Sequence, residues 1–315
     1  MWIISPFGSL QSLMDTPVVI WCFTDGKIGH KNQTQGLINA LARRTSIASH
    51  SIDVSMNAFH SLYFLFSGKF FRQLSELPVP HYLLAAGRKT QLPMLIAQWW
   101  FGGKSILLMR PYWPSSWFDM LMIPRHDNPK TQANIFLTDG AINMVTPSVN
   151  HNQAQGIILV GGPSKHYFWD STAIIQQILT LVNITPEICW TVSNSRRTPE
   201  DFLAQLKVLS TQVKLVDYRQ TDQSWLPQQL SSAGQIWVTP DSVSMLYEAM
   251  SSGATVACLE LKERDANNRI VQGIRGMIDK GMLTTFSQWQ KTRYLTVTLY
   301  PLNEAQRAAD WVLKQ

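Results

Sequence analysis

Short apolar runs alternate with longer amphipathic segments along almost the whole chain. Apolar strands set between helical segments are typical of parallel sheets with crossover helices, because such strands are buried on both faces. In the first half Thr90 is the expected cap, and Gly102–Gly103 the expected stop, of the second helix. The expected strands there are Val18–Phe23, Tyr82–Ala86, Ser105–Met109 and Met120–Ile123, and the expected helices are Gln33–Arg44 and Leu92–Phe101.

The same alternation begins again after the polar segment Pro147–Gln155. The expected strands are Gly156–Val160, Ile188–Val192, Lys214–Asp217, Gln235–Thr239 and Ala254–Leu259, and the expected helices are Ser171–Val182, Pro199–Ser210 and Ser242–Ser252. Two successive units of this kind predict an α/β protein with two lobes that face a central cleft. We expect domains at residues 15–150 and 151–300. Residues 301–315 are expected to form an amphipathic helix able to pack back on the first domain.

Composition agrees with two buried cores and makes the protein basic. Of 315 residues, 45% are hydrophobic and 15% charged, and lysine plus arginine exceed the acids by 27 − 21 = 6. That excess suits anionic partners such as nucleotide diphosphates, phospholipid headgroups or nucleic acid. We expect no nucleic acid, since no basic helix, RNP-like segment or zinc knuckle is visible. Cys22, Cys189 and Cys258 lie in separate apolar runs, which predicts buried thiols in a reducing compartment.

The sequence predicts a cytoplasmic protein with possible peripheral contact at the inner face of the cytoplasmic membrane. No apolar run reaches the roughly 18–20 residues that span a bilayer, and the opening segment lacks a basic n-region and a cleavage site. Met14 is a candidate start, because organised sequence begins at Val18. The aromatic segment Phe59–Leu74, flanked by Lys69 and Arg72, fits either a bilayer interface or a buried helix.

A turn crowded with polar residues follows the first strand, in "DGKIGHKNQ". In open parallel sheets, ligands bind beyond the carboxyl ends of the strands, where a tight turn exposes backbone N–H groups. Gly26 and Gly29 permit such a turn. In the alternative interpretation this is an ordinary loop in which Asp25 and Asn32 cap the helix. The side chains available for chemistry are Asp25, Lys27, His30 and Gln33.

Two further stretches follow strands of the second half. In "VGGPSK" the residues Gly161 and Gly162 allow close backbone approach, and Ser164 and Lys165, after Pro163, suit phosphate oxygens, although the spacing is not that of a Walker A motif. In "TPDSVSMLYEA" a helix capped by Asp241 or Ser242 presents its first-turn N–H groups to a diphosphate. Glu248, two turns further on, could accept hydrogen bonds from ribose hydroxyls or simply be solvated.

Arginines also follow strands in both halves, which suggests a basic cleft. In the second half they lie in the run Ser195, Arg196 and Arg197. In the first half the candidate cleft residues are Arg88, Arg110, Arg125, His126 and Asp127.

No HxxxH, CxxC or GxSxG pattern supports a metal site or an acyl-transfer nucleophile.

These motifs, with "AAGRKT", "IPRHD" and "SRRTP", occur in the order found in the family named for the plant elongated-mitochondria fission factor. Its bacterial members are annotated glycosyltransferases, some from lipo-oligosaccharide outer-core loci. The resemblance, from about Val18 to Leu261, implies a GT-B fold: two Rossmann-like lobes with the acceptor on the first and a nucleotide-sugar donor on the second. It implies that Gly161–Lys165 and Ser195–Arg197 line the donor phosphates or base, that Asp241 and Ser242 lie near the diphosphate, and that Asp25–His30 faces the acceptor.

The resemblance also implies an inverting, metal-independent transfer, in keeping with the absence of a DxD motif. His30 or Asp25 would take the proton from an acceptor hydroxyl, and we favour His30 because imidazole titrates near neutral pH. The nucleotide sugar is then a substrate, and no cofactor is expected. The expected acceptor is lipid-linked or a lipopolysaccharide core at the cytoplasmic membrane face. Two alternatives remain: a GT-B-like scaffold without turnover, and a nucleotide-sugar epimerase or hydrolase.

Overall fold

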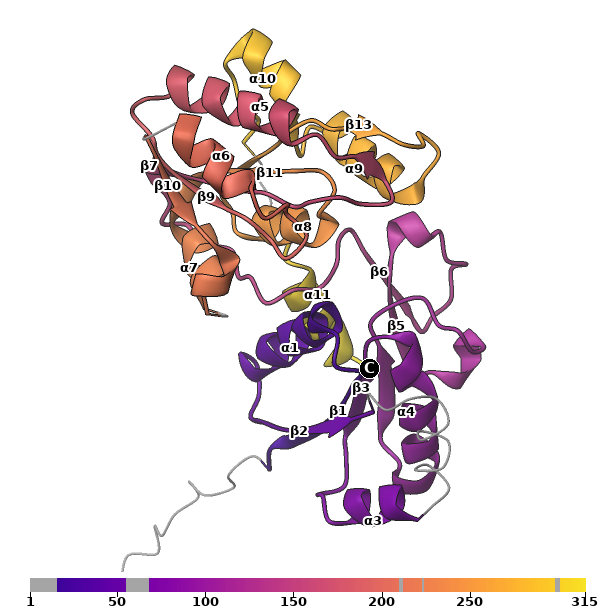
Figure 1. Ribbon diagram of the computed structural model, residues 1–315. Coiled ribbons are helices and arrows are strands. Elements are labelled where there is room, and N and C mark those ends of the chain that lie inside the picture. Colours follow the sequence, from indigo (N-terminus) through magenta and orange to yellow (C-terminus); the bar gives the residue numbers. More distant parts are fainter. Residues whose placement is uncertain (1–15, 55–67, 210–211, 223, 298–300) are drawn as a thin grey trace, which may run out of the picture. The chain divides into compact units, whose positions relative to one another are not determined.

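The computed structural model describes residues 16–54, 68–209, 212–222, 224–297 and 301–315 (Figure 1). The chain divides into two compact units. The first consists of the residues up to Met122 together with Gln132–Phe136 and Ala309–Gln315. The second consists of Ile123–Thr131 and Leu137–Ala308.

The first unit is built on a six-stranded sheet in the order β2-β1-β3-β4-β5-β6. β1 pairs in parallel with β2 and β3, β3 with β4, and β4 with β5. The strands are β1 (Val18–Thr24), β2 (Ile47–Asp53), β3 (Tyr82–Ala85), β4 (Lys104–Leu107), β5 (Met120–Pro124) and β6 (Ile135–Thr138). The described helices are α1 (Ile28–Ala42), α3 (Lys69–Ser75) and α4 (Arg88–Phe101), with the short 3₁₀ turn η1 (Ser115–Trp117). The 3₁₀ turn η2 (Arg125–Asp127), which follows β5, belongs to the second unit.

The second unit repeats this plan, with a sheet in the order β10-β9-β7-β11-β12-β14 whose neighbours all pair in parallel. The strands are β7 (Asn152–Leu159), β9 (Cys189–Ser193), β10 (Val213–Val216), β11 (Ala233–Val238), β12 (Thr255–Cys258) and β14 (Thr284–Thr285), and β8 (Tyr167–Phe168) pairs antiparallel with β13 (Lys262–Glu263). The helices are α5 (Ser171–Ile184), α6 (Phe202–Leu209), α7 (Trp225–Ser232), α8 (Val243–Ser251), α9 (Arg269–Asp279) and α10 (Phe286–Thr292), with the 3₁₀ turn η3 (Tyr218–Gln220). The last helix, α11 (Glu304–Val312), is divided between the two units at Ala309.

The second half of β7 is buried on both faces, which explains its continuous apolar sequence. Successive side chains of a strand point to opposite faces. Ile157 and Leu159 of β7 accordingly join a core that contains residues of α7, α8 and α9. Ile158, between them, joins the opposite core, which contains residues of α5, α6 and α10. The two faces of this sheet are thus covered by different helices (Figure 1), and the predicted α/β class is confirmed.

Several expectations from the sequence were wrong, each for a local reason. α1 begins at Ile28, five residues before the expected start. The residue that precedes α4 is Gly87, and Thr90 instead lies within the first turn, where its hydroxyl donates to the Gly87 carbonyl. Cys189 is exposed, because β9 begins there before entering the core. The edge strand β2 was missed, since only one of its side chains is fully buried.

The aromatic segment Phe59–Leu74 lies in part outside the described residues, which resume at residue 68. The part that is described packs inward: Phe70 and Leu74 of α3 are completely buried. These two side chains belong to a buried helix face and not to a bilayer interface. Among the described helices, none combines the length and the apolar character required to cross a membrane.

The last helix, α11, has the predicted amphipathic pattern. Ala305, Ala308, Ala309 and Val312 are buried, whereas Leu313 is exposed just beyond the helix. From Ala309 onward the chain is grouped with the first unit. There Asp310 pairs with Arg44 at 3.1 Å, and the Trp311 ring lies 5.6 Å from that of Phe136.

Candidate functional site

In the first unit the polar turn after β1 lies at the point where the strand order reverses. β2 lies on one side of β1 and β3 on the other, so the loops after β1 and β3 diverge there. In open parallel sheets this switch point is where ligands bind. Gly26 has φ of 78°, a backbone conformation that favours glycine, and α1 starts two residues later.

Asp25 and His30 form a hydrogen-bonded pair in this turn. Nδ1 of His30 lies 2.9 Å from Oδ1 and 3.0 Å from Oδ2 of Asp25. The Asp25 side chain is 2% exposed and the His30 side chain 20% exposed. An ionised carboxylate only accepts hydrogen bonds, so Nδ1 carries the proton and Nε2 of a neutral ring is left as the basic nitrogen. Asp25 thus orients His30 as the carboxylate of a catalytic triad orients its histidine.

Gly87, at the end of β3, completes this arrangement from a distant part of the sequence. Its φ is 108°, and a Cβ there would lie 2.6 Å from Nδ1 of His30 and 2.9 Å from Oδ2 of Asp25. The N–H of Gly87 is directed at Sδ of Met109, 3.2 Å away. A glycine is therefore required against the pair. The sequence reasoning did not select Gly87 as a site residue, although it stands in the quoted motif "AAGRKT".

The other residues expected on the acceptor side divide between the two units. In the first unit, Gly26, Lys27, Gly29 and Arg110 are exposed and Gln33 is half-buried, while the Arg88 guanidinium lies 3.7 Å from the centre of the Tyr112 ring. Arg125 and Asp127 belong instead to the second unit, because η2 packs against α9. There Nε of Arg125 donates to Asp139 at 2.7 Å, and the side chain of His126 lies outside the described residues.

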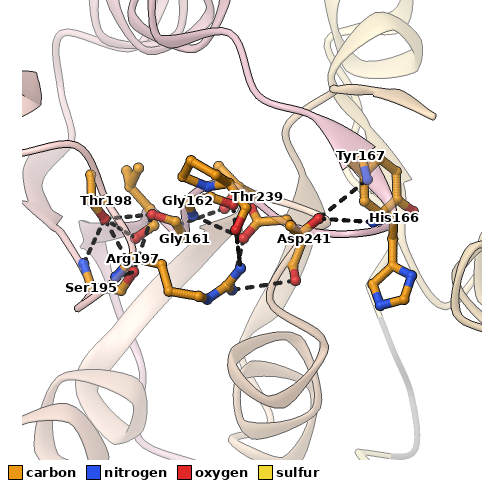
Figure 2. A network of polar contacts seen from close by, with 12 residues as sticks. Gly161, Gly162, His166, Tyr167, Ser195, Arg197, Thr198, Thr239 and Asp241 are labelled. Carbon is orange, nitrogen blue, oxygen red and sulfur yellow. Dashed lines mark hydrogen bonds and ion pairs between the residues drawn. The ribbon is translucent and has the colours of Figure 1, made fainter. Parts of the chain in front are cut away.

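In the second unit the loops after β7, β9 and β11 meet at the corresponding switch point (Figure 2). The N–H of Gly161 donates to Oγ1 of Thr239 at 2.7 Å, and the N–H of Gly162 donates to Oδ2 of Asp241 at 2.9 Å. A Cβ on Gly161 would lie 2.2 Å from Asp241, and one on Gly162 would lie 2.0 Å from the carbonyl oxygen of Arg197. The glycines let these loops approach one another, and their N–H groups donate to side chains of the loop after β11.

Arg197 ties the loops after β7 and β9 to that after β11 (Figure 2). Its Nη2 lies 2.8 Å from Oδ2 of the completely buried Asp241 side chain, and its Nη1 donates to the carbonyls of Gly162 and Pro163. The Arg197 side chain is nevertheless 42% exposed, so part of this cation still faces solvent. Its loop is fixed by Thr198, whose Oγ1 donates to the Val160 carbonyl at 3.0 Å. Sequence reasoning missed Thr198 and Thr239, because nothing local marks them.

Asp241 is the most buried charged group of this network. Burial raises the pKa of its carboxyl above the ordinary value, while hydrogen bonds from Gly162 and Thr239 and the charge of Arg197 act in the opposite direction. Its Oδ1 is buried and has no hydrogen-bond partner among the described residues. Asp241 therefore stabilises Arg197 and the loop from inside.

Helix α8 begins two residues after Asp241. Helices α5, α9 and α10 each begin with a side chain that accepts a hydrogen bond from a first-turn N–H: Asp170, Asn268 and Thr285. Ser242, the residue before α8, makes no such bond, and neither do the residues before α1, α3, α4 and α7. The first-turn N–H groups of α8 and the positive end of its dipole thus lie uncapped beyond the carboxyl end of β11, an arrangement suited to a phosphate group.

The remaining predicted donor residues lie around these loops. Glu248 is half-buried on α8, about one and a half turns from its first residue, Val243. Oγ of Ser195 donates to the Gly161 carbonyl at 3.1 Å, and Oγ of Ser164 accepts the N–H groups of His166 and Tyr167, so both hydroxyls hold the loops themselves. Lys165 and Arg196 are exposed. The structure therefore brings Arg197, Asp241 and the start of α8 together.

Comparison with known proteins adds a family and a fold. A sequence model of the family described as Mitochondrial fission ELM1 matches residues 28–315. The UDP-GlcNAc 2-epimerase of Neisseria meningitidis, solved with UDP-GlcNAc bound, is similar with a TM-score of 0.62 and 13% identity over 95% of this chain and 99% of that one. The UDP-GlcNAc 2-epimerase of Methanocaldococcus jannaschii has a TM-score of 0.60 and 12% identity over 95% and 100%.

A third similar structure is MurG of Acinetobacter baumannii, with a TM-score of 0.55 and 12% identity over 95% of this chain and 100% of that one. Among curated proteins, none matches the sequence. At these identities the similarities show the fold alone. The fold is GT-B-like: two α/β units, each with a six-stranded parallel sheet.

Proposed function

The chain belongs to the Mitochondrial fission ELM1 family, and from that premise we propose that it is an inverting, metal-independent glycosyltransferase. It moves a sugar from a nucleotide-sugar donor to a lipid-linked or lipopolysaccharide-core acceptor at the cytoplasmic membrane face. The observation that carries this proposal is that each unit has its own polar site at the carboxyl ends of its strands. The first unit holds a carboxylate-oriented histidine, and the second holds an uncapped helix start beside Arg197.

The donor is proposed to bind to the second unit through its diphosphate. The first-turn N–H groups of α8 accommodate one phosphate, and the exposed part of the Arg197 guanidinium neutralises its charge, with Arg196 next to it in sequence. Glu248, further along α8, is proposed to accept the ribose hydroxyls. The similar epimerase of Neisseria meningitidis was solved with UDP-GlcNAc bound, so a uridine diphosphate sugar is the first donor to test.

The chemistry follows from these two sites. Nε2 of His30 removes the proton from an acceptor hydroxyl, and Asp25 stabilises the imidazolium that forms. The acceptor oxygen forms a bond to the anomeric carbon while the bond from that carbon to the diphosphate oxygen breaks. The negative charge passes to the leaving nucleoside diphosphate, where the start of α8 and Arg197 stabilise it. No cofactor is required in this scheme.

A second candidate is a nucleotide-sugar epimerase or hydrolase, which the two similar epimerase structures favour. Such an enzyme would change the donor sugar, or release it, without an acceptor. The scaffold alternative predicts no nucleotide-sugar binding at all. Incubation of the protein with donor alone, followed by chromatography of the sugar, separates these possibilities from transfer.

The test combines donor binding with turnover in two variants. Purified protein is screened by thermal shift against UDP-, GDP-, CMP- and dTDP-sugars, since a ligand at 100 times its Kd adds about 2.7 kcal/mol to the stability of the folded state. Glu248→Ala should lose the shift. His30→Ala should keep the shift but lose turnover by roughly 10²–10⁴-fold, because it removes a base and no donor contact.

Glu187→Ala is the matched control for Glu248→Ala, since Glu187 is an exposed acid in the same unit. It should bind donor like the wild type. If no nucleotide sugar shifts the wild type, the donor site assigned to α8 is wrong and the scaffold is favoured. If His30→Ala turns over normally, His30 is not the base.

A further inference from the structure

Helix α4 of the first unit has two apolar faces, and only one of them packs on the sheet. The inward face includes Met94 and Ala97, which are completely buried. A second apolar row follows at the spacing i, i+3, i+4 and i+7, which places its members on one side of the helix. This outer row, which we call the tryptophan face together with the neighbouring Trp100 and Trp117, consists of Leu92, Leu95, Ile96 and Trp99.

The tryptophan face projects into solvent. Trp99 is 81% exposed, Trp100 61% and Trp117 52%. Monomeric proteins rarely expose several large aromatic side chains together without a binding role. A groove of about 520 Å³ lies between α4 and Trp117, and the residues that line it are Leu92, Leu95, Ile96, Gln98, Trp99 and Trp117.

The rings of this face are held in place by other aromatic residues. Trp99 contacts Trp100 edge to face at 5.4 Å, and Trp100 contacts Phe71 of α3 at 5.0 Å. On the other side of the groove, Trp117 stacks on Trp113 with ring centres 5.5 Å apart and planes inclined by 11°. The exposed tryptophans are therefore ordered, so little conformational entropy is lost when they bind.

The charged residues near the tryptophan face indicate which kind of partner binds there. The stretch from Leu77 to Phe118 contains four cations and no acid, and the acids that flank it are Glu76 and Asp119. Asp119 accepts hydrogen bonds from Gln98 of the groove and from Ser105, so its charge is partly compensated. The four cations are Arg88, Lys89, Lys104 and Arg110. Lys89 is exposed and precedes Leu92 by three residues and Ile96 by seven, so it belongs to the same side of α4. Tryptophan is the residue typical of the level of lipid headgroups, and nearby lysine and arginine are attracted by anionic lipids.

We propose that the tryptophan face is the surface by which this protein binds a bilayer that contains anionic lipids. Trp99 and Trp100 enter the headgroup region, the groove beside Trp117 receives apolar lipid surface, and Lys89 pairs with anionic headgroups. Helices that lie on a bilayer carry tryptophan and leucine on the side that enters it, with lysine or arginine beside them, and this side of α4 has that composition. The proposal names the membrane partner of the transferase proposed above, but it depends only on the first unit.

The experiment is sedimentation of the full chain with vesicles of phosphatidylcholine, with and without phosphatidylglycerol. Wild type should bind the anionic vesicles. Trp99→Ser should weaken binding at least about tenfold, since it removes a large interfacial side chain. Lys89→Gln should weaken binding to anionic vesicles by roughly fivefold, the effect of one cation near such a surface, and should change binding to phosphatidylcholine little.

Tyr294→Ser is the matched control, because Tyr294 is an aromatic residue of the second unit that is 64% exposed. It should bind vesicles like the wild type. Circular dichroism and the nucleotide-sugar thermal shift establish that Trp99→Ser is folded and keeps its donor site, so failure of this proposal is distinct from failure of the proposed function. Equal binding by Trp99→Ser and wild type, or no vesicle binding by wild type, would overturn the proposal. Loss of a dimer in Trp99→Ser would assign the face to self-association instead.

Discussion

At the scale of single residues, the site in the second unit depends on glycines that leave no room for a side chain. A Cβ on Gly162 would lie 2.0 Å from the Arg197 carbonyl oxygen, a backbone atom that cannot rotate away. We expect Gly162→Ala to lower the free energy of unfolding by about 1–3 kcal/mol. Gly273→Ala, in α9, meets nothing within 4 Å and should raise it by about 0.5–1 kcal/mol. Urea denaturation of both variants measures this, and equal values for the two would contradict the packing described around Gly162.

At the scale of elements, the capped helices stabilise the second unit and contrast with α8. Oδ1 of Asp170 accepts the Ala173 N–H at 3.0 Å and fixes the start of α5, whose Ile174, Ile175 and Ile178 pack into the core. Asp170→Ala should lower the free energy of unfolding by about 0.5–2 kcal/mol. Asp170→Ser, which retains an N-cap oxygen, should remain close to wild type. A thermal-unfolding series tests this, and the cap would have no role if Ala and Ser behaved alike.

At the scale of the whole molecule, buried acids give the stability a dependence on pH. Burial raises the pKa of Glu304 above its ordinary 4.5, although Arg307 acts against the shift. The folded chain then binds more protons than the unfolded chain above that value, so Glu304 contributes stability at low pH that is lost as the pH rises through its raised pKa. Glu304→Gln should therefore lose less stability than wild type between acidic and neutral pH. Urea denaturation across this range measures the difference, and parallel curves would exclude a contribution from Glu304.

The sequence by itself determined the class of the fold and the places where sites lie. Strands buried on both faces must be apolar throughout, so β1, β3, β7 and β11 could be located within a few residues. Polar and glycine residues after these strands indicated the two sites. The edge strand β2 and the two-residue β14 escaped notice, since few of their residues form a local apolar run.

Only the tertiary structure decided which of the predicted residues act together. It placed Gly87 against the Asp25–His30 pair and joined Arg197 to Asp241, and it separated Arg125 from the first unit. It also showed that Gly161 and Gly162 serve loop packing. The physical reason is that a local pattern records whether a side chain is buried, whereas contacts between distant loops depend on the order in which the strands pair.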